Sequence, residues 1–242
     1  MNRPPLSACA APSTAWPILL SQGGLVYLAG QLTEHTGNVA YAWSVVLFVA
    51  AAMFLSLWVY HAFILPRPAS DHRVAQSDNY IAEYFATFRA FFVRKDILLV
   101  LGFILTFRLG ESQLIKMVIP FLKDPALKGG LGLSTSQVGM VYGTIGVLFL
   151  TLGGLLGGYL ISKLGLKRCL WLLVFAVHVP DLAFVFLATT LPQNIVVVGA
   201  CIAIEQFGYG LGFTALMLYM IMVAEGEHKT AHYAICTGIM AA

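Results

Sequence analysis

Two long stretches without Asp, Glu, Lys or Arg constrain what this chain can fold into. They are residues 35–66 and 129–162. A helix needs about 20 mostly apolar residues to cross the roughly 30 Å hydrocarbon core of a bilayer, and each stretch is longer than that. Apolar residues make up 59% of the chain and charged residues only 10%, unlike a soluble domain. The sequence therefore predicts an integral membrane protein that has the lipid bilayer as its solvent.

The same criterion predicts about six spanning helices and a shorter last one, in an all-α membrane bundle. The expected spans are residues 16–32, 39–64, 97–121, 136–162, 169–190 and 194–223. Residues 35–38 are turn-forming, so the first two spans should form a hairpin. Residues 230–242 cover only about 20 Å as a helix, and we expect this last helix to be truncated within the membrane.

Basic residues predict the orientation of the spans, because Lys and Arg concentrate in short cytoplasmic loops. Five of them lie in residues 67–95, and Lys163, Lys167 and Arg168 follow a later span. Both segments are expected in the cytoplasm, together with residues 1–15 and 225–229. The turns at 33–38 and 191–193 and the loop after residue 121 are expected outside.

The first basic segment also contains an amphipathic pattern. Aromatic residues recur at helical spacing between Tyr80 and Phe92, and Asp78, Glu83 and Arg89 lie on the other side. We expect a helix here. It either lies along the membrane surface, as interfacial helices do, or packs on the bundle as a loop helix, and the pattern fits both.

Ionisable residues within the spans are the candidates for function, because a charge in the bilayer core is costly. Arg108 and Glu111 lie three residues apart on one helical face, where they can pair. Glu205 and Gln206 form a polar pair within a later span. In one interpretation, Arg108 holds an anionic substrate group in a hydrated cavity, and Glu111 or Glu205 takes up a proton. In the other, Arg108 and Glu111 neutralise each other and hold two helices in register.

Four more polar residues lie within spans. Gln113 and Lys116 follow Glu111 on the same helix and join the candidates for substrate or proton binding, although Lys116 lies high enough to snorkel outward. Asp181 follows Pro180, with His178 one turn earlier. A proline frees a backbone carbonyl that attracts polar neighbours, so we expect Asp181 and His178 to be structural.

Glycines recur within two of the spans. They are Gly139, Gly143, Gly146, Gly153, Gly154, Gly157 and Gly158 in one, and Gly208, Gly210 and Gly212 in the other. Small residues four apart let helix backbones approach closely in lipid. Close packing is the interpretation we adopt for most of them, although helices that rock during transport need the same smooth faces.

Other function classes find little support. Cys9, Cys169, Cys201 and Cys236 lie far apart without a C-x-x-C pair, so neither a disulfide framework nor a metal site is indicated, and no cofactor is expected. Basic residues are scattered between apolar runs, which argues against nucleic-acid binding. A membrane-embedded enzyme such as an acyltransferase needs a nucleophile beside a base, and no His accompanies Ser or Cys at a recognisable spacing.

One loop resembles a known motif. Residues 157–168, GGYLISKLGLKR, resemble the cytoplasmic loop G-x-x-x-D-R-x-G-x-[RK]-[RK] of the major facilitator superfamily. The matching positions are Gly158, Lys163, Gly165, Lys167 and Arg168, and Ser162 replaces the usual Asp. The resemblance implies a cytoplasmic gating loop, whose usual charge relay the Ser162 replacement alters. Its place after a span that enters from outside agrees with the predicted orientation.

Four longer segments resemble the AmpG-like muropeptide permeases, a branch of that superfamily that includes acetyl-coenzyme A transporters. They are SQGGLVYLAGQL, YHAFILPRP, FFVRKDILLVLGFILTFRLGES and IEQFGYGLGFTALMLYM, similar to that family's fifth, sixth, seventh and tenth helices. The likeness covers most of the chain from Trp16 onward. It implies an irregular cytoplasmic N-terminus (1–15), the last two helices of an N-terminal bundle (16–66), a central cytoplasmic loop (67–95) and an incomplete C-terminal bundle (96–242), and therefore a fragment.

By the same resemblance, full-length relatives import N-acetylglucosaminyl-anhydromuramyl peptides with protons, for peptidoglycan recycling. The implied partners are an anionic glycopeptide and protons, and the implied form is a monomeric, multi-pass symporter of the inner membrane. An acyl-coenzyme A or another organic anion is the alternative substrate. A single central Arg provides little positive charge for the several phosphates of an acyl-coenzyme A. Because substrate sites in this superfamily lie between two halves, we also expect the fragment alone to be inactive.

Overall fold

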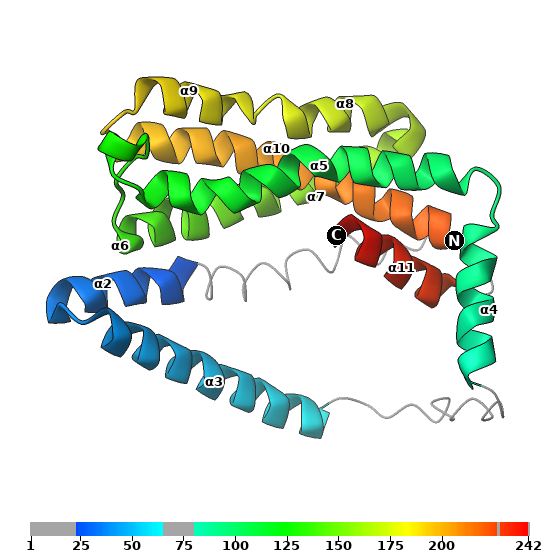
Figure 1. Cartoon of the computed structure of the whole chain (residues 1–242), viewed down its shortest axis with the longest axis horizontal. Coiled ribbons are helices and arrows are strands. Elements are labelled where there is room, and N and C mark those ends of the chain that lie inside the picture. The colour runs from blue at the N-terminus through cyan, green and yellow to red at the C-terminus, as the bar shows by residue number, and fades with distance from the viewer. Residues whose placement is uncertain (1–22, 65–79, 227, 242) are drawn as a thin grey trace. The chain divides into compact units, whose positions relative to one another are not determined.

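The computed structural model describes residues 23–64, 80–226 and 228–241, in which every regular element is a helix (Figure 1). The α-helices are α2 (Val26–Thr36), α3 (Val39–Ile64), α4 (Tyr80–Phe92), α5 (Ile97–Lys123), α6 (Thr135–Val138), α7 (Val147–Leu164), α8 (Leu166–His178), α9 (Leu182–Thr190), α10 (Ile195–Ala224) and α11 (Lys229–Ala241). The short segment η2 (Ala126–Lys128) is a 3-10 helix, and η3 (Gly139–Gly146) is a π-helix. The expected all-α fold is confirmed.

Among the described residues, five helices are long and apolar enough to cross a membrane. They are Val39–Ile64, Ile97–Lys123, Thr135–Leu164, Leu166–Thr190 and Ile195–Ala224. Their bounds agree with five predicted spans to within a few residues. Large apolar side chains remain exposed on them, such as Phe63 at 85% and Leu98 at 83%, which a bilayer accommodates and water does not.

The first predicted span, 16–32, is described only from residue 23 onward. Its helix α2 continues past the predicted end to Thr36, where Gly37 stops it. Gly37 has a φ of 66° and its N–H donates to the Thr33 carbonyl at 2.9 Å, a left-handed helix end that glycine adopts without strain. Since α3 begins at Val39, a short turn separates the two helices, as predicted.

Two of the long helices are locally irregular. In the helix Thr135–Leu164, α6 and α7 are joined by the π-helical segment η3, a form that is rare and often found at functional sites. In the helix Leu166–Thr190, the regular pattern stops between α8 and α9, where Pro180 lacks the N–H needed to continue it. Both irregularities lie beside the candidate site.

The contacts divide the chain into two compact units, the first made of residues 1–50 and 109–219 and the second of residues 51–108 and 220–242. In the first unit, glycines pack α10 tightly against its neighbours. A methyl group at Gly153 of α7 would overlap the carbonyl of Phe207, and one at Gly208 would lie 2.7 Å from the ring of Pro180. The expectation that glycines serve close helix packing is confirmed at these positions.

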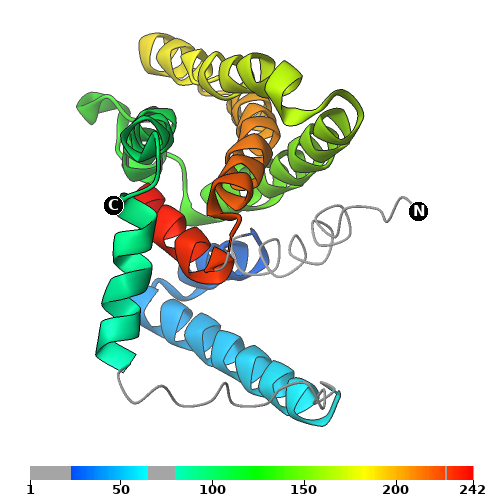
Figure 2. The same cartoon turned by 90° about the vertical axis from the view of Figure 1, so that its right-hand side faces the viewer.

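In the second unit, α4 packs against α11 (Figure 2). The ring centroids of Phe91 and His232 are 5.4 Å apart, and Phe91 is fully buried. The predicted helix at residues 80–92 is confirmed, and its location on the membrane surface stays a prediction. After α4, the guanidinium of Arg94 donates to the backbone carbonyls of Val223 and Glu225, so it caps the end of α10.

Candidate functional site: a buried carboxylate cluster

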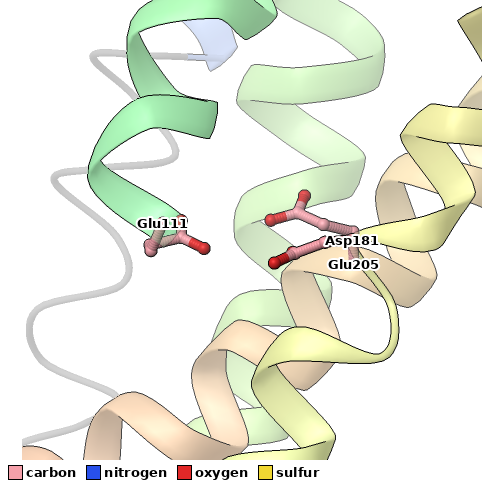
Figure 3. Close-up of side chains that lie close together, drawn as sticks. All are labelled: Glu111, Asp181 and Glu205. Atoms are coloured by element: carbon pink, nitrogen blue, oxygen red, sulfur yellow. The ribbon is translucent and has the colours of Figure 1, made fainter. Parts of the chain in front are cut away.

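Three carboxylates from three parts of the first unit converge inside it. Glu111 comes from α5, Asp181 from the turn between α8 and α9, and Glu205 from α10, and Figure 3 shows the side chains directed toward one space. One carboxylate oxygen from each lies within 4.8 Å of the others. Glu111 is 2% exposed and Glu205 1% exposed. The two acids singled out from the sequence are therefore neighbours in the interior.

The break around Pro180 explains how Asp181 reaches this space. Its residues form a turn in place of a regular helix, with Leu182 and Ala183 bonded back to Val179 and Pro180. Because Gly208 packs closely on Ala176 and Pro180, α10 passes directly beside this turn, and Glu205 lies three residues before Gly208. Proline and glycine together bring the two carboxylates close.

Gln206 completes the polar group on α10. Its Nε2 donates to both carboxylate oxygens of Glu205, at 3.0 and 3.3 Å, and the side chain is buried. Gly146 of η3 leaves room for it, because a methyl group there would lie 3.3 Å from Cγ of Gln206. The polar pair predicted from the sequence is thus a hydrogen-bonded unit.

Tyr142 is a member of the site that the sequence reasoning missed. It lies on η3, hydrogen-bonds the side chain of Gln206, and is near enough to Glu205 and Glu111 to interact electrostatically with both. The signal that could have identified it is a tyrosine inside a glycine-rich apolar span, where a hydroxyl needs a partner.

His178 borders the cluster. Its Nδ1 is 3.8 Å from Oδ2 of Asp181, and Gly110 of α5 is the residue that faces its ring. We expected Asp181 and His178 to be structural. The structure shows the turn at Pro180 and also places the half-buried Asp181 beside the two buried glutamates, so a role for Asp181 in the site is a proposal.

Three further candidates lie on α5 together with Glu111. Arg108 is half-buried one turn before Glu111, and it belongs to the second unit. Gln113 and Lys116 lie further along the helix with exposed side chains. The suggested pairing of Arg108 with Glu111 stays a prediction.

The loop motif forms a tight turn between α7 and α8. Gly165 has a φ of 79° and a ψ of 147°, a combination that essentially only glycine adopts. Ser162 donates to the Tyr159 carbonyl at 2.8 Å, and Nζ of Lys163 lies 5.9 Å from the centre of the Tyr159 ring. Lys167 and Arg168 begin α8, while Gly158 lies against Thr214. The backbone angles explain why residue 165 is a glycine, and the gating role of the loop stays a prediction.

The cluster could in principle bind a cation, since carboxylate oxygens are the ligands that hard cations prefer. Gln206 donates to both oxygens of Glu205, and carboxylates that bind metal ions accept such hydrogen bonds as well. A proton binds a single carboxylate oxygen and needs no set of ligands.

Comparison with known proteins agrees with these features. Residues 18–241 match the family model of the Major Facilitator Superfamily. The chain is 25% identical over 156 residues to the anhydromuropeptide permease of Escherichia coli K12, covering 64% of the chain and 30% of the permease. It is 23% identical over 220 residues to a candidate AmpG transporter, AmpG 4, of Rickettsia conorii, covering 90% of the chain and 50% of that protein.

An uncharacterized protein of Haemophilus influenzae is similar over a comparable length, at 26% identity over 232 residues, 92% of the chain and 51% of that protein. The chain therefore spans about half the length of these curated relatives. The names of the relatives point to transport and not to enzymatic chemistry, and the likeness to AmpG-type permeases seen in the sequence is confirmed. With its spanning helices and a family match that covers nearly its whole length, the chain belongs to the major facilitator superfamily.

Proposed function

We propose that this protein serves proton-coupled import of anionic anhydromuropeptides across the inner membrane, for cell-wall recycling. The substrate class is suggested by the name of the Escherichia coli relative. The coupling is suggested by the cluster of Glu111, Asp181 and Glu205, and this observation carries the proposal.

Three acids in this arrangement are suited to handling protons. Like charges a few ångströms apart in a poorly solvated interior repel strongly, and uptake of a proton relieves that repulsion. Each acid comes from a different helix or turn, so a change in charge alters the forces between elements that must move in a transporter. Proton binding in the cluster can thereby favour one arrangement of the helices over another.

Arg108 is the proposed partner of the substrate's anionic group. It is a half-buried cation one turn from Glu111 on α5, and a guanidinium binds carboxylates through paired hydrogen bonds. The same reasoning limits the alternative. An acyl-coenzyme A carries several phosphates, for which a single arginine is a poor match.

The test measures the uptake of radiolabelled anhydromuropeptide by energised membrane vesicles. The vesicles contain the protein that is encoded by the complete reading frame to which this sequence belongs. We expect uptake that requires the proton gradient and is lost in Glu111→Gln and Glu205→Gln. Asp124→Asn is the matched control, because Asp124 is an exposed acid in a loop. Gradient-driven uptake that survives both glutamate changes would defeat the coupling. Uptake of radiolabelled acetyl-coenzyme A in place of muropeptide would favour the alternative substrate.

A further inference from the structure

Helix α2 and the start of the long helix Thr135–Leu164 touch backbone to backbone. A methyl group on Gly30 of α2 would overlap the backbone nitrogen of Ser136, and one on Gly139 would lie 2.6 Å from the backbone nitrogen of Tyr27. Each helix thus contributes a glycine against the other's main chain. Any larger residue at either position must push the two helices apart.

A hydrogen bond joins the same two helices near the ends of this contact. The buried hydroxyl of Ser136 donates to the carboxylate of Glu34 near the end of α2. The other carboxylate oxygen of Glu34 accepts from Gln31 at 3.3 Å. Glu34 is therefore held from both sides, by its own helix and by the neighbouring one.

The position of Glu34 is also favourable for its charge. Ser134 caps the long helix, accepting from the N–H of Gln137 while the Gln137 side chain accepts from the N–H of Ser134. The Ser134 and Ser136 hydroxyls are 2.8 Å apart, so the Glu34 carboxylate lies at the helix N-terminus. There, unpaired N–H groups and the helix dipole favour a negative charge.

This contact lies on the side of the membrane that the basic residues predict to be outside, since the turn at 33–38 and the residues before Thr135 both belong there. The resemblance to the superfamily implies that α2 and the helix Thr135–Leu164 belong to different bundles, and both lie in the first unit, in contact with each other. A transporter that alternates its access must separate such bundles on one side while they stay closed on the other.

We propose that Glu34 and Ser136, together with Gly30 and Gly139, form an outer latch that holds the extracellular side of the transporter closed. The latch lies on the same long helix as Tyr142, because η3 begins at Gly139, directly after α6, and Tyr142 hydrogen-bonds Gln206 beside the carboxylate cluster. Opening therefore strains the segment that borders Gln206 and Glu205. The latch presupposes the proposed transport function, and the contacts of α2 with the helix Thr135–Leu164 are the observations that support it.

The test measures access to the latch without measuring transport. Ala29 is fully buried on α2 next to Gly30, so Ala29→Cys reports opening when Cys9, Cys169, Cys201 and Cys236 are replaced by alanine. Right-side-out vesicles containing the full chain are treated with a membrane-impermeant maleimide. We expect Glu34→Ala to label about three- to tenfold faster than its parent, since a hydrogen bond to a charged group is lost, and Gly30→Leu to label faster still.

Matched controls separate the latch from general loosening. Gly102→Leu makes the same change in a helix where nothing lies within 4 Å of the added atom, and Asp124→Ala removes an exposed acid; both should label at the parental rate. Because Gly30→Leu could prevent folding, Glu34→Ala decides the outcome, with size-exclusion profiles confirming a folded protein. Equal labelling in Glu34→Ala and the parent overturns the latch, whatever the uptake assay shows. Failed uptake beside accelerated labelling instead counts against the substrate alone.

Discussion

The side-chain amide of Gln206 donates to both carboxylate oxygens of its chain neighbour Glu205, at 3.0 and 3.3 Å, inside the first unit. Because the donor is the next residue in the chain, this hydrogen bond of the buried Glu205 depends little on contacts with other helices. The pair therefore moves with α10 as one unit.

Replacing Gln206 with Met should destabilise the protein by about 1–3 kcal/mol, because a buried acceptor loses its donor. In a double-mutant cycle, Glu205→Met combined with Gln206→Met should cost clearly less than the sum of the single changes. Thermal unfolding in detergent measures both. Gln113→Met is the control, since Gln113 is exposed, and equal effects at positions 113 and 206 would contradict the role of the pair.

The glycine contacts of α7 with α10 predict a position-dependent response to alanine. Gly153→Ala should lower the free energy of unfolding by roughly 2 kcal/mol or more, because the methyl group meets the Phe207 carbonyl and both helices must shift. Gly238→Ala in α11 places its methyl group in open space and should be neutral or stabilising by up to about 1 kcal/mol. Similar unfolding temperatures for the two variants would show that α7 and α10 are not packed this closely.

Arg94 supplies the third prediction, through its bonds to the carbonyls of Val223 and Glu225. Arg94→Met should leave the end of α10 uncapped and speed hydrogen exchange of the amides in residues 220–226 about tenfold or more, since charge-assisted bonds contribute about 1.5–3 kcal/mol. Arg94→Lys should restore part of the protection, because one ammonium cannot span two carbonyls as a guanidinium does. Arg89→Met is the matched control, because Arg89 is an exposed residue of α4, and exchange that is equally fast in both Met variants would exclude a capping role.

The sequence was most informative where one physical requirement dominates. The length of apolar runs predicted α3, α5 and α10 nearly to the residue, because a spanning helix must satisfy its own backbone and match the bilayer thickness. The end of α2 was less accurate, since its last turn is polar and Gly37, not the loss of hydropathy, stops the helix.

The site was less predictable because it depends on contacts between distant residues. Hydropathy identified Glu111 and Glu205 as costly within a span, but it could not show that they face one another. Asp181 was assigned a structural role because Pro180 alone explained a polar neighbour. Tyr142 is uncharged, so the search for ionisable residues within the spans did not select it. What joins these residues is glycine packing between helices, which a single sequence suggests without specifying the partners.

Asp181 supplies the last prediction, because its two possible roles lead to different results. If it belongs to the proton site, Asp181→Asn keeps the shape of the side chain but removes a charge from the cluster. Uptake driven by the proton gradient should then fall by about tenfold or more, with fewer protons entering per solute, while the unfolding temperature changes little. If it is only a partner for the kink at Pro180, the unfolding temperature should fall while the proton-to-solute ratio stays the same.

The control for Asp181 is His178→Gln, which breaks the 3.8 Å contact between Nδ1 and Oδ2 of Asp181 while leaving all three acids in place. A proton site formed by the carboxylates alone should keep its proton-to-solute ratio in this variant. A ratio that changes in His178→Gln and not in Asp181→Asn would move the proton-binding role from the acid to the imidazole, the side chain whose charge changes most readily near neutral pH.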